Sequence, residues 1–370
     1  MGIRIGLVGD TMLGRGVAQR LAADGPERLF SPDLVDVAHE ADLLVLNLEC
    51  CISVRGTRWP ARGKPFFFRA PPAAVDALAR LGVDCVTLAN NHALDYGHVA
   101  LLDTLAHLDA GDIGCAGAGP DLYHARRPVE LEAAGVRVGV IGLSDHPRDY
   151  AARPDRPGIA YAELRSCTTP RMPPWVTEQI ERAHSTCDLV LVTPHWGPNM
   201  TAAPVRHVRA AAAELVASGA GVVAGHSAHV FHGVQGPVLF DLGDFLDDYA
   251  TDPVHRNDLG LFWLVTVDDA GMPTQVEAVP LHLDFAHTRL ATAAEAAEIE
   301  ARFRSACAAL GTVALRRVNR FVVQPPSPAR RRSGGRGHRW DWTVHFRRPR
   351  TPWRYRCAGS RAHESCHVLR

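Results

Sequence analysis

Five short polar motifs carry the side chains in this sequence that could do chemistry, and each follows a run of apolar residues. They combine carboxylates, amides and imidazoles: Gly9-Asp10, Asn47-Leu48-Glu49, Asn90-Asn91-His92 with Asp95, Pro194-His195-Trp196-Gly197, and Gly225-His226-Ser227-Ala228-His229. In an open α/β sheet the carboxyl ends of the strands meet at one crevice. Motifs far apart in the chain can therefore share one site, and these residue types predict a metal centre.

Each motif alone also has an ordinary structural explanation. Asp10 could cap a helix, Asn90 and Asn91 could form a turn, and a lone histidine on an apolar run is more often a core residue than a ligand. Packing alone, however, does not require two carboxylates and three imidazoles to follow five separate apolar runs. Imidazole with carboxylate ligands favours Zn, Mn, Fe or Co over Ca or Mg, so we expect one or two such ions.

The remaining polar candidates concern proton transfer and anion binding. His92 can act as a general acid if a carboxylate holds its other ring nitrogen, and Asp95 is the expected partner. Arg69 and Arg256 are candidate contacts for an anionic substrate. For Arg69, a structural hydrogen bond to the backbone is an equal alternative.

Alternating apolar runs and helical patterns must position these motifs. Runs rich in β-branched residues predict strands, and Ala, Leu and Val at helical spacing predict helices. Early alternation of the two, followed by adjacent late strands, predicts two stacked sheets with outer helices. The expected strands are 3–8, 43–46, 85–88, 136–143, 189–193, 221–224, 238–241, 261–267 and 276–283, and the expected helices are 73–81, 99–108, 175–184, 205–217 and 292–310.

Composition is typical of a soluble globular protein with a different C-terminal segment. Of 370 residues, 46% are hydrophobic and 22% charged, and the start of the chain resembles neither a signal peptide nor a membrane span. We therefore expect a cytoplasmic protein without a membrane span. The nine cysteines lack CxxC spacing, which predicts buried thiols rather than disulfides or a zinc ribbon.

Residues 326–370 hold twelve of the 40 basic side chains but only Asp341 and Glu364 of the 40 acidic ones. This Arg-rich composition predicts a basic, disordered tail, either functional or a reading-frame artefact. Arginine-rich segments can bind phosphates of nucleic acids or membranes. The tail has no repeat or recognition motif, so no nucleic-acid partner is expected.

Several motifs together resemble the CapA family of capsule and poly-γ-glutamate synthesis proteins, which is related to calcineurin-like metallophosphoesterases. The resemblance covers roughly residues 3–285, and its motifs are Phe66 to Ala70 with Pro71-Pro72, Leu88 to Gly97, Gly225 to Val230, and Leu242-Gly243-Asp244-Phe245. It implies a four-layer α/β/β/α sandwich with a two-metal centre. Carried over to this chain, it implies the following roles: Asp10 and His229 bind the first metal, Glu49 bridges both, Asn91, His195 and His226 complete the second, and His92 is the acid.

One departure from the superfamily pattern bears on the first metal. A typical metallophosphoesterase opens with Asp-x-His, whereas this chain has Asp10-Thr11-Met12, and Glu49 replaces the usual bridging Asp. The first site is therefore expected to be weaker or empty.

Two functions follow from the resemblance. The first is a metal-dependent hydrolase or transferase of the CapA type, acting on phosphoester, acyl-phosphate or amide-like bonds in polymer or peptide biosynthesis. The second is a non-catalytic accessory protein that binds an acidic polymer or a synthetase partner. The expected organisation is a CapA-like domain over 1–290, a helical extension over 291–325 and the tail over 326–370.

Overall fold

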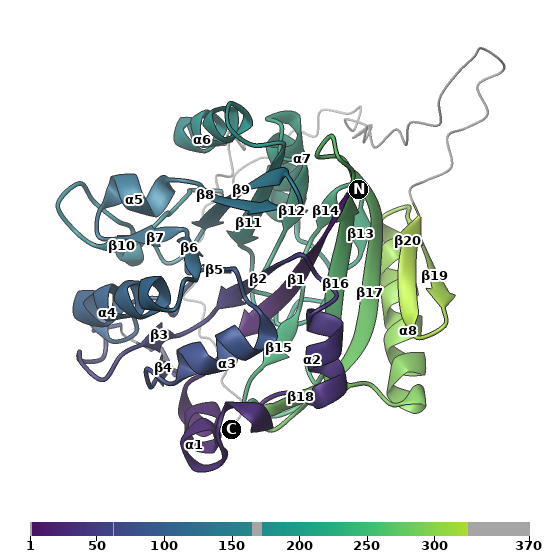
Figure 1. The fold of residues 1–370 in the computed structure, drawn as a ribbon, viewed down its shortest axis with the longest axis horizontal. Coiled ribbons are helices and arrows are strands. Elements are labelled where there is room, and N and C mark those ends of the chain that lie inside the picture. The colour runs from purple at the N-terminus through teal and green to yellow at the C-terminus, as the bar shows by residue number, and fades with distance from the viewer. Residues whose placement is uncertain (1, 62, 165–171, 325–370) are drawn as a thin grey trace, which may run out of the picture.

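The computed structural model describes residues 2–61, 63–164 and 172–324 (Figure 1). The predicted disordered tail at 326–370 lies outside these residues. None of the helices in the described part of the chain is long and apolar enough to cross a membrane.

The larger sheet has ten strands and is built around β1, which is buried along almost its whole length. β1 pairs in parallel with β2 and β15 and antiparallel with β16. The main order is β19-β20-β17-β16-β1-β2-β5-β6, while β18 pairs with β17. These strands are β1 (Ile3–Thr11), β2 (Leu43–Leu48), β5 (Cys85–Thr87), β6 (Gly114–Ala116), β15 (Asp244–Leu246), β16 (Leu259–Val267), β17 (Pro273–Asp284), β18 (His287–Leu290), β19 (Val313–Arg317) and β20 (Arg320–Gln324).

The second sheet has six strands in the order β13-β14-β12-β11-β9-β8. They are β8 (Val129–Ala133), β9 (Val136–Ser144), β11 (Leu189–His195), β12 (Val222–Ala224), β13 (Val234–Gln235) and β14 (Val238–Leu239). Two small two-stranded sheets lie outside them, formed by β3 (Cys51–Ile52) with β4 (Arg69–Ala70) and by β7 (Ala118–Gly119) with β10 (Gly158–Ile159).

Side-chain alternation along the strands separates the molecule into layers. Successive strand residues face opposite sides, so Ile5 and Leu7 pack between the two sheets while Val8 packs under outer helices. One outer layer is α1 (Arg15–Asp24), α2 (Pro32–Ala38), α3 (Ala74–Leu81) and α4 (Gly97–Ala110), and the other contains α6 (Pro174–His184) and α7 (Arg206–Ala217). The expected four-layer α/β/β/α sandwich is confirmed.

The other two α-helices of the described residues are the short α5 (Leu122–Arg126) and the long α8 (Ala293–Ala309). A capping box between Thr292 and Glu295 starts α8. Its apolar face sends Ile299 and Phe303 into the core between the sheets. Figure 1 shows α8 alongside β17, β19 and β20, and β20 pairs with β17.

Candidate metal centre

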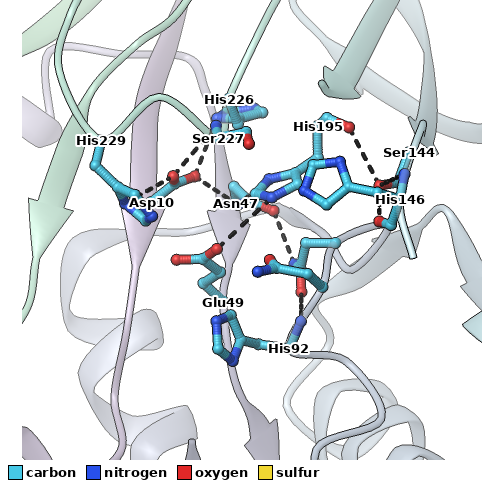
Figure 2. Close-up of polar contacts among 12 residues, drawn as sticks. Asp10, Asn47, Glu49, His92, Ser144, His146, His195, His226, Ser227 and His229 are labelled. Carbon is cyan, nitrogen blue, oxygen red and sulfur yellow. Dashed lines mark hydrogen bonds and ion pairs between the residues drawn. The ribbon is translucent and has the colours of Figure 1, made fainter. Parts of the chain in front are cut away.

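The neighbouring strands β1 and β2 bring the two carboxylates and one amide together (Figure 2). Asp10 and Asn47 are paired residues of the parallel ladder, and Asn47 Nδ2 donates to Asp10 Oδ1 at 2.6 Å. Glu49 follows β2 directly and is fully buried. Neither of its carboxylate oxygens has a hydrogen-bond partner among the described residues. A buried carboxylate without partners is costly, so this position calls for a cation.

The second sheet supplies the imidazoles. β11 ends on His195, which forms an isolated bridge with His226 just after β12. His195 Nε2 lies 3.7 Å from Glu49 Oε1, and His226 Nδ1 lies 3.7 Å from Asp10 Oδ1. His229 Nδ1 lies 3.4 Å from Asp10 Oδ2. The site therefore sits where the carboxyl ends of strands from both sheets converge.

Three ligand atoms satisfy the geometry of one metal site. Atoms of Asp10, Glu49 and His229 all lie within 4.8 Å of one another. Metal–ligand bonds of roughly 2.0 to 2.2 Å place neighbouring ligand atoms about 3 to 3.5 Å apart. The 3.4 Å separation between Asp10 and His229 fits such a site without rearrangement.

Two other polar atoms of the predicted ligand set are buried without a hydrogen bond. His226 Nδ1 and Asn91 Oδ1 are buried, and neither finds a hydrogen bond within the described ranges. Asn90, by contrast, is structural, because its amide donates to Asn47 Oδ1 and to the Leu48 carbonyl. Imidazole nitrogen and amide oxygen are both donor types that a second ion could use.

Charge at the centre is unbalanced. Burial, reinforced by the Asp10 carboxylate, raises the pKa of Glu49 well above its ordinary value. Burial lowers the pKa of His226 to about 4, against the effect of Asp10. Burial also lowers the pKa of His195 well below its usual value. Burial opposes protonation of His229 as well, but the carboxylates of Asp244, Glu49 and Asp10 raise its pKa well above the usual range. Crowded carboxylates beside neutral imidazoles fit divalent cations.

The turn that carries His226 and His229 holds a strained backbone. Ser227 has φ of +108° and His229 has φ of +60°, both in the left-handed region. Ser227 N–H donates to Asp10 Oδ2 at 3.3 Å, so the turn is tied to the carboxylate that it faces. Non-glycine residues in this region concentrate at functional sites.

His92 and Asp95 form a buried pair beside the cluster. His92 Nδ1 lies 2.6 Å from Asp95 Oδ2, and the Phe68 ring packs on the imidazole with centroids 4.2 Å apart. Asp95 also receives Lys64 Nζ at 2.5 Å and the Tyr150 hydroxyl at 3.3 Å. Burial lowers the pKa of His92 to about 4, although the Asp95 carboxylate acts to raise it.

The structure does not bring the two candidate arginines to the cluster. The Arg69 guanidinium lies over the Tyr96 ring and donates to the Arg55 carbonyl at 3.2 Å. This is the structural hydrogen bond to the backbone that was the alternative for Arg69. Arg256 pairs with Asp258 and Glu298. It lines a cavity beside α8 whose described lining residues include none of the cluster.

Four residues near the centre were not assigned a role from the sequence. Asn47 holds Asp10, Lys64 holds Asp95, and Asp244 Oδ1 lies 2.8 Å from His229 Nδ1. His146 lies beside His195, with ring centroids 5.2 Å apart, and its Nδ1 contacts Asp145 at 2.5 Å. Asn47 shares a strand face with Glu49, and Asp244 lies in a motif already noted. The sequence therefore gave some indication of a role for Asn47 and Asp244, but none for Lys64 or His146.

Comparison with known families identifies the chain. The family model described as bacterial capsule synthesis protein PGA_cap matches residues 4–249, a stretch that contains every residue of the cluster. The chain belongs to this family. The expected CapA resemblance is thereby confirmed.

Relatives within and around the PGA_cap family carry related names. A "probable polyglutamine synthesis accessory protein" of Mycobacterium tuberculosis is 31% identical, with 75% of this chain and 84% of the relative covered. The PGA biosynthesis protein CapA of Bacillus subtilis is 26% identical over 65% of this chain and 62% of its own length. Among solved structures, the Haemophilus influenzae NAD nucleotidase is similar with a TM-score of 0.43 and 11% identity, over 76% of this chain and 50% of that one.

Proposed function

We propose that this CapA-type protein of capsule or poly-glutamate biosynthesis is a metal-dependent hydrolase or transferase. Its substrates would be phosphoester, acyl-phosphate or amide-like bonds in a polymer or peptide. The observation that carries the proposal is the buried Glu49 carboxylate, whose two oxygens have no hydrogen-bond partner among the described residues. Buried polar atoms without hydrogen bonds are uncommon, and each calls for an explanation such as a bound ion.

In this proposal Asp10, Glu49 and His229 would hold one ion, and Glu49, Asn91, His195 and His226 would hold the other. Such ions would supply Lewis-acid polarisation of the scissile group and activation of water near neutral pH. Asn47 fixes the Asp10 carboxylate through its 2.6 Å hydrogen bond. The cluster is almost fully buried, which keeps its electrostatic interactions strong.

His92 would donate a proton to the leaving group. Asp95 accepts the Nδ1 proton, so the imidazole orientation is set. With a pKa of about 4, His92 is neutral at pH 7 and must gain a proton before it can act as an acid. An anionic substrate beside the ring raises its pKa, so proton uptake on binding would prepare the acid, which then donates to the departing oxygen or nitrogen. Lys64 holds Asp95 from the other side.

A substrate screen tests the proposal. Purified protein loaded with Mn²⁺ or Zn²⁺ is assayed on phosphoester, γ-glutamyl and peptide substrates, with Glu49→Gln as the paired variant. We expect turnover by the wild type and loss of both metal and turnover in Glu49→Gln. Inactivity of metal-loaded wild type on every substrate of the screen would reject the proposed enzymatic function.

The second candidate is a non-catalytic accessory protein that binds an acidic polymer or a synthetase. Two observations favour it: the name of the Mycobacterium tuberculosis relative and the loss of a ligand at Met12. Met12 is buried, and its sulfur accepts a hydrogen bond from the Gly14 N–H. Binding of poly-glutamate by a chelated, inactive protein would support this function. A cytoplasmic location remains part of either proposal.

A further inference from the structure

We propose that Arg15 binds a carboxylate of the substrate at the entrance to the metal centre, and that Phe66 packs against the methylene groups next to this carboxylate. The inference rests on the proposed metal-dependent function and narrows its substrates to chains of glutamate-like residues. Arg15 takes the role first expected for Arg69 and Arg256, whose guanidinium groups bond elsewhere.

The side chains of the metal centre differ in how far they reach the surface. His92 is 6% exposed and His229 is 7% exposed, and Asn91 is partly exposed. The other predicted ligands are each at most 1% exposed: Asp10, Glu49, His195 and His226. A substrate would therefore approach the ions from the side of His92 and His229.

Three aromatic side chains form a wall on that side. The Phe68 ring lies 4.2 Å from the His92 ring, measured between centroids. The Tyr249 ring meets His229 edge-on at 5.6 Å. Phe66 stacks on Phe68 at 6.2 Å and lies 6.3 Å from Tyr249. Because Phe66 is 47% exposed, this aromatic wall extends from the two histidines to the surface.

Arg15 lies over the outer part of the aromatic wall. Its guanidinium carbon is 5.0 Å from the centroid of the Phe66 ring and 5.7 Å from that of Phe68. Its Nε lies 3.2 Å from Oδ2 of the buried Asp248. The two terminal nitrogens make no hydrogen bond within the described ranges, and the side chain is 37% exposed. The guanidinium is therefore held at one edge, and its planar fork is available to a carboxylate.

The turn after β1 fixes the position of Arg15. A Cβ at Gly14 would come within 2.9 Å of the Arg69 backbone nitrogen, so this glycine lets the turn pack against the segment that carries the aromatic wall. Arg15 itself has φ of +49°, in the left-handed region that is uncommon for residues other than glycine. Such residues concentrate at functional sites.

These surroundings suit a carboxylate beside methylene groups better than a free phosphate. The guanidinium supplies the paired donors that a carboxylate accepts, while the exposed Phe66 ring offers apolar contact to methylene groups. Inorganic phosphate has no apolar part and would gain nothing from Phe66. Chains of glutamate residues satisfy both requirements.

Peptide binding, measured by isothermal titration calorimetry, tests the contact. The probes are γ-linked triglutamate and the same peptide with its α-carboxyl groups amidated, added to Mn²⁺-loaded full chain that carries His92→Asn to slow turnover. Arg15→Gln should weaken binding of the charged peptide about 10- to 100-fold, the usual contribution of hydrogen bonds to a charged group, and leave the amidated peptide within a few-fold. Arg20→Gln is the matched control, since Arg20 lies on the same helix with 35% of its side chain exposed. It should leave both peptides within a few-fold.

The comparison of the two peptides separates binding from a structural role. Equal weakening of both peptides by Arg15→Gln would mean that Arg15 only supports the aromatic wall, and would overturn the contact. Triglutamate that does not bind while Arg15 is intact, or Arg15-dependent binding of inorganic phosphate alone, would also overturn it. Phe66→Ala should weaken both peptides alike, since both carry the methylene groups, and unchanged affinities would overturn the role of Phe66.

A second variant covers the case in which Arg15→Gln does not fold. Arg15→Lys keeps the charge but loses the fork, so it should weaken the charged peptide alone by roughly 10-fold, the low end of the same range. An affinity equal to that of the protein with Arg15 would overturn the contact. A wild type that takes up no metal and turns over no substrate would instead reject the metal-dependent function, and the same titrations would still decide the role of Arg15.

Discussion

The histidines of the centre differ in what surrounds their ring nitrogens, and this difference assigns them different tasks. His195 and His226 are held neutral by burial and offer a lone pair. His229 lies among carboxylates that keep it charged until a cation replaces its proton. His92 pairs with Asp95, a carboxylate that is not a candidate metal ligand. Substitution of single histidines can therefore distinguish the metal ligands from the residue that carries the proton.

Replacement of His92 should affect turnover more than metal content. His92→Asn removes the proton donor, so kcat should fall by about 10² to 10⁴, while inductively coupled plasma analysis finds metal near the wild-type level. The fall should be smallest for a nitrophenyl ester, whose leaving group needs no proton. His232→Ala is a control, since this buried histidine bonds to the Thr201 carbonyl. Equal rates for wild type and His92→Asn on every substrate would refute the acid role.

Acid should destabilise the metal-free protein partly through His92. Its folded pKa of about 4 is below the unfolded value of about 6.5, so the unfolded chain binds more protons between these values. Stability therefore falls as the pH drops from about 6.5 toward 4 and is unaffected by this group above that window. From pH 7 to pH 5 the loss due to His92 is about 2 kcal/mol. Urea unfolding in EDTA should show the wild type losing that much more than His92→Asn, and identical losses would contradict the shift.

At the scale of elements, the pairing of β15 with β1 places Asp244, whose Oδ1 lies 2.8 Å from His229 Nδ1, beside Asp10. β15 is only three residues long, and its position follows from the absence of a side chain at Gly9. A single added methyl group at this one glycine therefore tests the arrangement.

Gly9→Ala should separate β15 from β1 and weaken Mn²⁺ binding together with stability. The new Cβ would meet the Gly243 carbonyl oxygen at 1.7 Å, and overpacking of this kind destabilises by about 1 to 3 kcal/mol or more. Gly6→Ala on the same strand is the matched control, because it meets only side chains, the nearest at 2.8 Å. Calorimetric titration should show a larger loss of affinity for Gly9→Ala. Similar affinities in the two variants would rule out the close approach as a requirement.

The local periodicity of the sequence predicted most strands of the two sheets. It did not predict which strands pair with one another. All nine expected strands are present, with shifted ends: β11 continues to His195 because His195 pairs with Ser144 of β9. The motif residues from Asp10 to His229 converge because they end strands. The sequence could not show that Asp244 and Asn47 contribute to the site, because their roles depend on cross-strand distances to Asp10. The contacts of Arg256 with Asp258 and Glu298 depend likewise on how a loop meets α8.

For the molecule as a whole, the centre joins the two sheets at one end of their shared core. Asp10 and Glu49 come from the ten-stranded sheet and its following loop, whereas His195 and His226 come from the six-stranded one. Without cations, like charges of buried carboxylates meet at this junction, and burial and Asp10 both raise the pKa of Glu49. Ions bound there would act as a clamp between the layers as well as a reactive centre.

Metal removal should therefore lower the stability of the whole fold rather than of one loop. An ion that binds only the folded state stabilises it by about 2.7 kcal/mol at a concentration of 100 times its Kd. EDTA should lower Tm in a calorimetric scan, and Mn²⁺ with Zn²⁺ should restore it.

In the double variant His195→Ala with His226→Ala, metal content should fall and the response of Tm to Zn²⁺ should disappear, because both imidazoles of the second site are lost. His232→Ala, which leaves the cluster intact, should respond like the wild type. The imidazoles and carboxylates lie on different sheets, so a Tm of metal-loaded wild type that does not change with EDTA would mean that no ion links the layers. A normal response to Zn²⁺ in the double variant would mean that His195 and His226 are not needed to hold the ion.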